Sequence, residues 1–149
     1  MSVAPITLED ARTELNARCN AIEECYEFML AYAAQGLEGT ENSGSTKQVR
    51  EFLEKCDTAL VGLAGFVGQF IAQFQTESAA KYAAFMAVID RDARDSQAAV
   101  QLVIAQSAIS SQLVDNLNAS IHLRALLTDL FLIDEILKPR DTLKASTPD

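Results

Sequence analysis

The sequence predicts an all-α protein, an up-down-up-down four-helix bundle, from three observations. Residues that favour helix dominate the 149-residue chain, whereas glycine (6) and proline (3) are scarce. Apolar residues recur at three- and four-residue spacing along most of the chain, which is the period of an amphipathic helix. The periodic segments are nearly equal in length and are joined by short connections, as in bundles of antiparallel neighbours.

The first helix is predicted over residues 7–35. Thr7 is a favourable N-cap, and two acidic residues follow in the first turn, where the helix dipole favours negative charge. Gly36 is placed to end the helix, because glycine accepts the left-handed conformation common after a C-terminus. The polar, glycine-rich segment 36–45 predicts the one clear loop.

The second helix is predicted over 45–75, with Ser45 as its N-cap. It contains Gly62, Gly65 and Gly68 within the stretch ALVGLAGFVGQF. No strand precedes these glycines and no Lys-Ser or Lys-Thr follows them, which excludes a phosphate-binding P-loop. Since the apolar period continues on both sides, they are expected to form a smooth helix face that a neighbouring backbone approaches closely, within the bundle or across a dimer.

The third and fourth helices are predicted over 78–105 and 109–138, because QTES and QSAISS supply capping residues at the two breaks. Pro139 ends the last helix. The alternative architecture is a dimer of long helical hairpins, in which the second and third helices are continuous. Either way, residues 1–138 form one helical domain and residues 139–149 a disordered tail.

The end of the fourth helix, LLTDLFLIDEIL, is apolar on more than one stripe. A surface helix needs an apolar face only about 100° wide, so some of these side chains are expected to contact a partner. A symmetric homodimer is the commonest such arrangement. The predicted interface comprises Leu127, Phe131, Ile133, Ile136 and Leu137, together with Gly62, Gly65 and Gly68.

Charge and composition exclude several classes of function. The formal net charge of −9 disfavours binding to nucleic acid and to anionic membranes. Residues 58–76 lack charge, but their glutamines, glycines and threonines and the absence of flanking anchors argue against membrane insertion. No secretory signal is visible, and three cysteines do not suit a disulfide framework, so a cytoplasmic protein with buried thiols is expected.

Catalytic and metal chemistry have little support in the sequence. It has one histidine and neither Glu-x-x-His nor Cys-x-x-Cys, so no metal, no cofactor and no enzymatic activity are expected. His122 is expected at the rim of the bundle. Its functional alternative is a phospho-acceptor, as in histidine phosphotransfer domains, although Ala125 and Leu126 replace the lysine and glycine typical of that motif.

The middle of the third helix offers only Ala93 and Ser96 to the core, a small and rather polar layer that suits close packing or a small-ligand pocket. The function expected from the whole sequence is a non-enzymatic helical protein–protein interaction module, of an adaptor, chaperone-like or regulatory kind, acting through apolar helix faces. The alternatives are a phosphotransfer-like module that uses His122 and a small-ligand binder in the bundle core.

Overall fold

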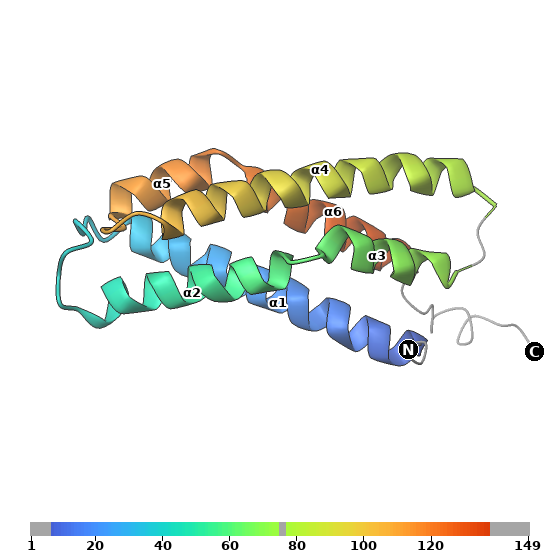
Figure 1. Ribbon diagram of the computed structural model, residues 1–149, viewed down its shortest axis with the longest axis horizontal. Coiled ribbons are helices and arrows are strands. Elements are labelled where there is room, and N and C mark those ends of the chain that lie inside the picture. Colours follow the sequence, from blue (N-terminus) through green and yellow to red (C-terminus); the bar gives the residue numbers. More distant parts are fainter. Residues whose placement is uncertain (1–6, 75–76, 138–149) are drawn as a thin grey trace, which may run out of the picture.

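The computed structural model describes residues 7–74 and 77–137, and the predicted tail lies outside these ranges (Figure 1). Within them the regular structure consists of six α-helices and no strand, which confirms the all-α prediction. The helices are α1 (Leu8–Ala33), α2 (Gly44–Leu60), α3 (Leu63–Ala72), α4 (Ala79–Ile104), α5 (Ser111–Ala119) and α6 (His122–Leu137).

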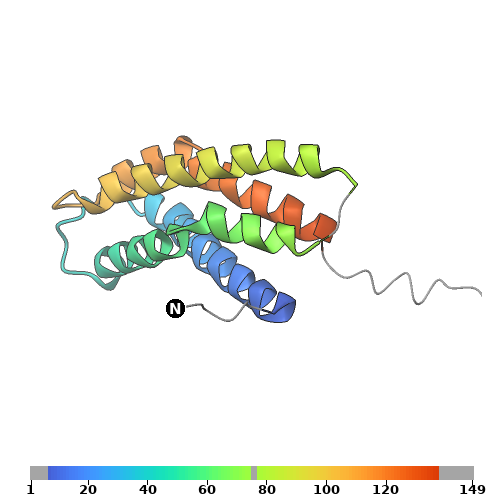
Figure 2. The same cartoon turned by 45° about the vertical axis from the view of Figure 1, so that its right-hand side comes forward.

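The two 26-residue helices, α1 and α4, organise the molecule, because each packs against α2, α3, α5 and α6. The shorter helices follow one another along the long axis, α2 before α3 and α5 before α6 (Figures 1 and 2). One end of the molecule therefore gathers α3, the start of α4 and the end of α6. The other end gathers α2, α5 and the end of α4.

The first helix begins and ends close to the predicted positions. Thr7 Oγ1 accepts a hydrogen bond from the Asp10 backbone N–H at 3.0 Å, as expected of an N-cap. Gly36 has a φ of 68°, in the left-handed region. The following loop packs on the α4–α5 connection at Gly39, where a Cβ atom would lie 2.5 Å from the Ile109 carbonyl oxygen, so glycine is required there.

The predicted helix 45–75 is two helices, and its N-cap is Ser43, whose Oγ accepts from the Thr46 backbone N–H at 3.2 Å. The break follows α2 at Gly62, which has a φ of 64°. That conformation costs other residues about 1–2 kcal/mol but costs glycine little, so this glycine serves a turn rather than a helix face.

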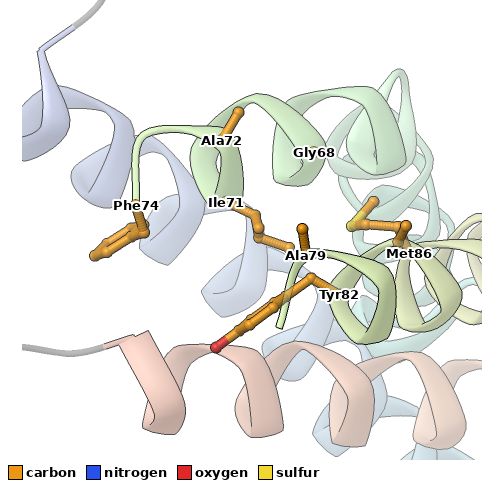
Figure 3. A pocket seen from close by; sticks show the side chains of 8 residues that line it. Gly68, Ile71, Ala72, Phe74, Ala79, Tyr82 and Met86 are labelled. Carbon is orange, nitrogen blue, oxygen red and sulfur yellow. The ribbon is translucent and has the colours of Figure 1, made fainter. Parts of the chain in front are cut away.

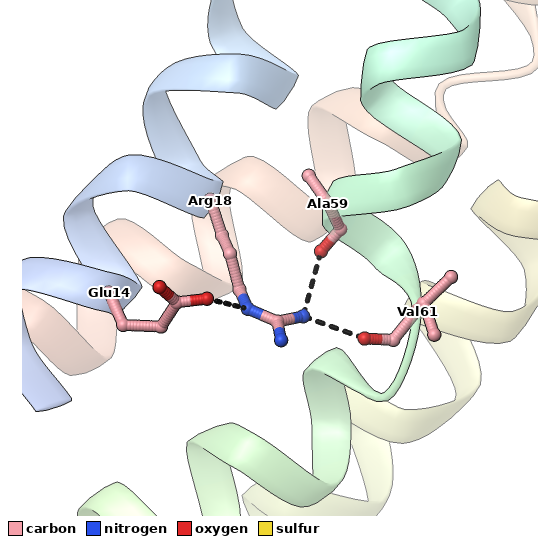
Figure 4. A network of polar contacts seen from close by, with 4 residues as sticks. All are labelled: Glu14, Arg18, Ala59 and Val61. Atoms are coloured by element: carbon pink, nitrogen blue, oxygen red, sulfur yellow. Dashed lines mark hydrogen bonds and ion pairs between the residues drawn. The ribbon is translucent and has the colours of Figure 1, made fainter.

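An arginine from α1 satisfies the carbonyl groups exposed at this break (Figure 4). The Arg18 Nη1 donates to the carbonyl oxygens of Ala59 at 3.2 Å and Val61 at 2.7 Å, while its Nε pairs with Glu14 at 3.1 Å. Its guanidinium also stacks over the Phe66 ring at 5.1 Å. The break is thus held against α1 by charge-assisted hydrogen bonds.

The predicted helix 109–138 is also divided, into α5 and α6. Ser110 caps α5 by accepting from the Leu113 backbone N–H at 3.0 Å. The chain turns at Ile121, whose φ of 60° is rare for a β-branched residue. Since neither glycine nor proline marks this turn, the sequence pattern gave no signal for it.

The break between the predicted second and third helices is present, because α3 ends at Ala72 and α4 begins at Ala79. This finding contradicts the long helical hairpin with a continuous second and third helix. At the same end of the molecule, Arg12 of α1 donates to Asp134 Oδ1 at 2.9 Å and to the Leu137 carbonyl oxygen at 2.8 Å. Its guanidinium stacks over Phe70 of α3 at 5.2 Å, so one residue ties α1 to both α3 and α6.

Candidate functional site

The first ten residues of α4, AAKYAAFMAV (residues 79–88), form the most unusual surface in the described part of the chain. None of them is buried, and Lys81 is their one charged residue. A helix that is apolar on every side is normally buried in a protein core. This segment therefore has the composition of a buried helix, although none of its residues is buried in the described structure.

A first groove lies between α3 and this part of α4 (Figure 3). It has a volume of about 480 Å³ and is lined by Gly68, Ile71, Ala72 and Phe74 from α3 and its end, and by Ala79, Tyr82, Ala83 and Met86 from α4. A Cβ atom at Gly68 would lie 3.7 Å from the Met86 Cε atom, an ordinary contact. Small residues on both helices keep this groove open.

A second groove, of about 270 Å³, lies on the other side of Tyr82, between α4 and α6. Its lining comprises Ser78, Lys81, Tyr82, Phe85, Leu132, Ile133 and Ile136. The side chains of Leu132 and Ile136, one turn apart on α6, remain 50% and 44% exposed. We call the two grooves, together with residues 79–88, the open end.

The structure divides the predicted α6 interface into three parts. Leu127, Ile133 and Leu137 are buried in the chain's own core, and Ile133 also lines the second groove. Ile136 lines the second groove. Phe131 is 46% exposed, but at about 100° per residue it faces a different direction from Leu132 and lines neither groove.

The predicted glycine face is not present as such. Gly62 forms the turn before α3, and a Cβ atom at Gly65 would meet nothing within 4 Å. Among the described residues, no neighbouring backbone packs closely against Gly65. Of the three glycines, Gly68 is the one that lines a groove.

His122 is half-buried and begins α6, directly after the turn at Ile121. The second groove is lined by residues from the opposite end of the same helix, and the first groove by residues of α3 and α4. The candidate phospho-acceptor and the open end are therefore separate places on the molecule.

A pair of carboxyl groups lies between α4 and α6, one turn from the second groove. Asp129 is 9% exposed, its Oδ2 is buried and has no hydrogen-bond partner among the described residues, and its carboxyl group contacts that of Asp92. Burial, the hydrogen bond with Asp92 and the Asp92 charge raise the pKa of Asp129 to about 7. One turn beyond Asp92, Ser96 is fully buried beside Ala93, as predicted, and its hydroxyl is also without a partner in the described structure.

The three cysteines are buried and free, as predicted. Burial, with smaller effects of Asp134 and Glu23, raises the pKa of Cys19 to about 11. A hydrogen bond with Cys25 and burial raise the pKa of Cys56 far above its ordinary value. The Cys25–Cys56 contact between α1 and α2 is one that the sequence spacing did not predict. Thiols in this state are poor nucleophiles.

Tyr82, Phe85 and Met86 continue the apolar period of α4 and were not among the site residues predicted from the sequence. The structure leaves them half-buried beside the two grooves. The alanines on the remaining sides of the same segment were the available signal, since a helix exposed to water usually carries charge there.

Within residues 7–74 and 77–137, no group of three or more histidine, cysteine or acidic side chains is placed to hold a metal ion. None of the described helices combines the length and the apolar character that a membrane span requires. Comparison of the chain with protein-family models, curated proteins and solved structures gave no match.

Proposed function

We propose that the protein is a non-enzymatic helical interaction module that associates with a second copy of itself through the open end. The observation that carries this proposal is the apolar and uncovered segment 79–88 of α4. Covering apolar surface is the main favourable term in protein association, at roughly 25 cal/mol per Å².

The size of the open end suits a dimer interface. Val88, Leu132 and Ile136 expose 37%, 50% and 44% of their surface, and the half-buried aromatic residues and exposed alanines around them add to this area. Aromatic side chains bury about 150–250 Å² each when fully covered, so Tyr82 and Phe85 add apolar area to an interface at this end. A standard interface buries about 800 Å² per partner.

The charge of the open end also favours a second copy. The chain carries 21 acidic and 12 basic residues, so two copies repel each other over most of their surface. Residues 79–88 contribute no negative charge, and their one charge is the positive Lys81. Pairing through the open end therefore brings the least acidic part of α4 of each copy into contact.

The shape of the open end allows symmetric pairing. Tyr82 lies between the two grooves and lines both, so protruding side chains and hollows occur on the same surface. In a two-fold dimer each surface contacts its own copy, which requires this kind of self-complementarity. We also propose that the fold is an up-down-up-down four-helix bundle, in which α2 and α3 together form one of the four antiparallel segments and α5 and α6 together form another. We also propose a cytoplasmic location, which suits three free thiols.

Sedimentation velocity tests the proposal across a concentration series that includes about 50 µM, where a complex with a micromolar dissociation constant is populated. We expect a concentration-dependent dimer. The change Leu132→Asp places a charge in the second groove and is expected to give a monomer. A wild-type chain that stays monomeric throughout the series would contradict the proposal.

Two matched variants show whether the effect is local to the open end. Leu102 lies near the other end of α4 and is 67% exposed, and Phe131 neighbours Leu132 but faces elsewhere. Leu102→Asp and Phe131→Asp are both expected to leave the dimer intact. Loss of the dimer in Leu102→Asp alone would place the interface at the opposite end of the molecule.

A further inference from the structure

The Asp92–Asp129 contact lies where the open end meets the closed part of the α4–α6 packing. Asp129 precedes the groove residues Leu132 and Ile133 by one turn of α6. On α4, Phe85 of the same groove precedes Asp92 by two turns. The carboxyl pair therefore lies just beyond the second groove without lining it, and it connects the two helices that form the walls of that groove.

Two carboxylates in contact repel each other, and in a site with little water this repulsion is poorly screened. The pair is tolerated when one proton is shared, because one carboxyl group then donates a hydrogen bond to the other. The Oδ2 atom of Asp129, buried and unpartnered, gives the ionised form no compensating donor. The geometry thus favours the protonated pair.

Among the described residues, no lysine, arginine or histidine side chain forms an ion pair with Asp129. On α4, Arg94 pairs with Asp90, and both Arg91 and Arg94 are exposed. On α1, Arg12 pairs with Asp134, and Glu23 acts on Cys19. The one charged residue of α5, Asp115, is exposed. On α6 itself, His122 is two turns away, and Arg124 lines the same surface cavity of about 330 Å³ as Asp129.

We propose that Asp92 and Asp129 form a proton-sharing pair that holds α4 and α6 together at the base of the open end, and that its ionisation moves these helices apart and weakens self-association. The link to association rests on the proposed function. The link between the pair and the α4–α6 spacing stands without it. The device makes association stronger on the acidic side of neutrality and weaker on the alkaline side.

The titration of the Asp129 carboxyl carbon, followed by NMR in the full chain, tests the pair directly. In the wild type we expect a midpoint near the pKa of about 7 that the burial and the Asp92 contact produce. In Asp92→Asn the midpoint is expected to fall, because the second charge is gone while the burial is kept. An ordinary midpoint near 4 in the wild type would overturn the proposal.

The dissociation constant of the dimer, measured by sedimentation between pH 5.5 and 8.5, tests the coupling. We expect it to rise by roughly tenfold across this range, which corresponds to a difference of about half a pKa unit per subunit between the monomer and the dimer, because the dimer contains two such pairs. In Asp129→Asn the dissociation constant is expected to be independent of pH, and in the exposed control Asp95→Asn it should follow the wild type. A wild-type dimer whose affinity ignores pH would overturn the coupling, whereas a monomer at every pH would overturn the proposed function and leave the NMR test of the pair standing.

Discussion

The two parts of α4 have the same secondary structure and opposite relations to the rest of the molecule. From Ile89 onward, the buried positions recur at three- and four-residue spacing, and charged residues cover the other faces as far as Asp95. Before Ile89, no residue is buried and one is charged. The helix is continuous across the boundary, so the difference lies in what covers it.

This difference shows that apolar content alone does not identify a core. The later part of α4 packs between its neighbours, whereas the earlier part is flanked by two grooves, toward α3 and toward α6. A single chain that folds in isolation gains nothing from ten such residues in water. They become useful when a second molecule removes them from water.

The largest expected effect is a difference in stability loss between two neighbouring residues, Ile89 and Val88, which lie on either side of the boundary. Ile89 is fully buried, so Ile89→Ala is expected to lower the free energy of unfolding by about 2–5 kcal/mol. Val88→Ala should change it by less than about 0.5 kcal/mol in the monomer, because Val88 is an exposed position. Urea denaturation measures both losses, at a protein concentration low enough to keep the chain monomeric. Equal losses of stability in the two variants would contradict the claim that the two parts of α4 differ in burial.

The pH dependence of stability probes the junction between the two parts. Asp129 has a pKa of about 7 in the folded protein and an ordinary value near 3.8 when unfolded, so the folded state binds more protons between these pH values. Its contribution to the free energy of unfolding therefore falls as the pH rises from about 4 to about 7, and it is constant at higher pH. The difference between the wild type and Asp129→Asn, followed by urea denaturation, should show this slope, and Asp95→Asn should not change it.

Substitutions at two glycines test the geometry of α3, which forms one wall of the first groove. Gly62→Ala is expected to lower stability by about 1–2 kcal/mol, because its φ of 64° is unfavourable for alanine. Gly65→Ala should raise it by up to about 1 kcal/mol, since the space around its Cβ position is open and the residue is helical. Thermal unfolding distinguishes the two signs. A stabilising Gly62→Ala would mean that α2 and α3 form one helix after all.

The smallest effect concerns the one charge of the open segment. Lys81→Glu should weaken association by less than about 1 kcal/mol at low salt, because it makes each acidic chain more negative and so increases the repulsion between the two copies. Added salt should restore most of the loss, since exposed charges are screened beyond about 10 Å at 0.1 M. Sedimentation equilibrium at two salt concentrations measures this. A gain in affinity would show that Lys81 faces a basic residue.

The sequence predicted the parts of the fold that depend on local signals. Thr7 and Gly36 act as predicted, and the QSAISS stretch supplies a cap, because caps and left-handed turns depend on a few neighbouring residues. The turn at Ile121 was missed because a positive φ in a β-branched residue has no local cause. It is maintained by the packing of α5 and α6 on α1 and α4.

The candidate site was harder to predict, for a related reason. The apolar excess of α6 was visible, but Ile133 and Ile136 are three residues apart and differ in burial because of what lies opposite each. Likewise, Tyr82 and Ile89 belong to one periodic stripe, and the spacing of α3 and α6 decides which of them is covered. The spacing of apolar residues along one helix does not predict how far that helix lies from its neighbours.

The most direct test of a second copy at the open end is hydrogen–deuterium exchange along α4 at two protein concentrations, one below and one above the dimer range. Amides of residues 79–88 should become more protected at the higher concentration, while those of residues 93–103, already packed in the monomer, should not change. Protection in 79–88 that is the same at both concentrations, or a gain confined to the other end of α4, would contradict the account.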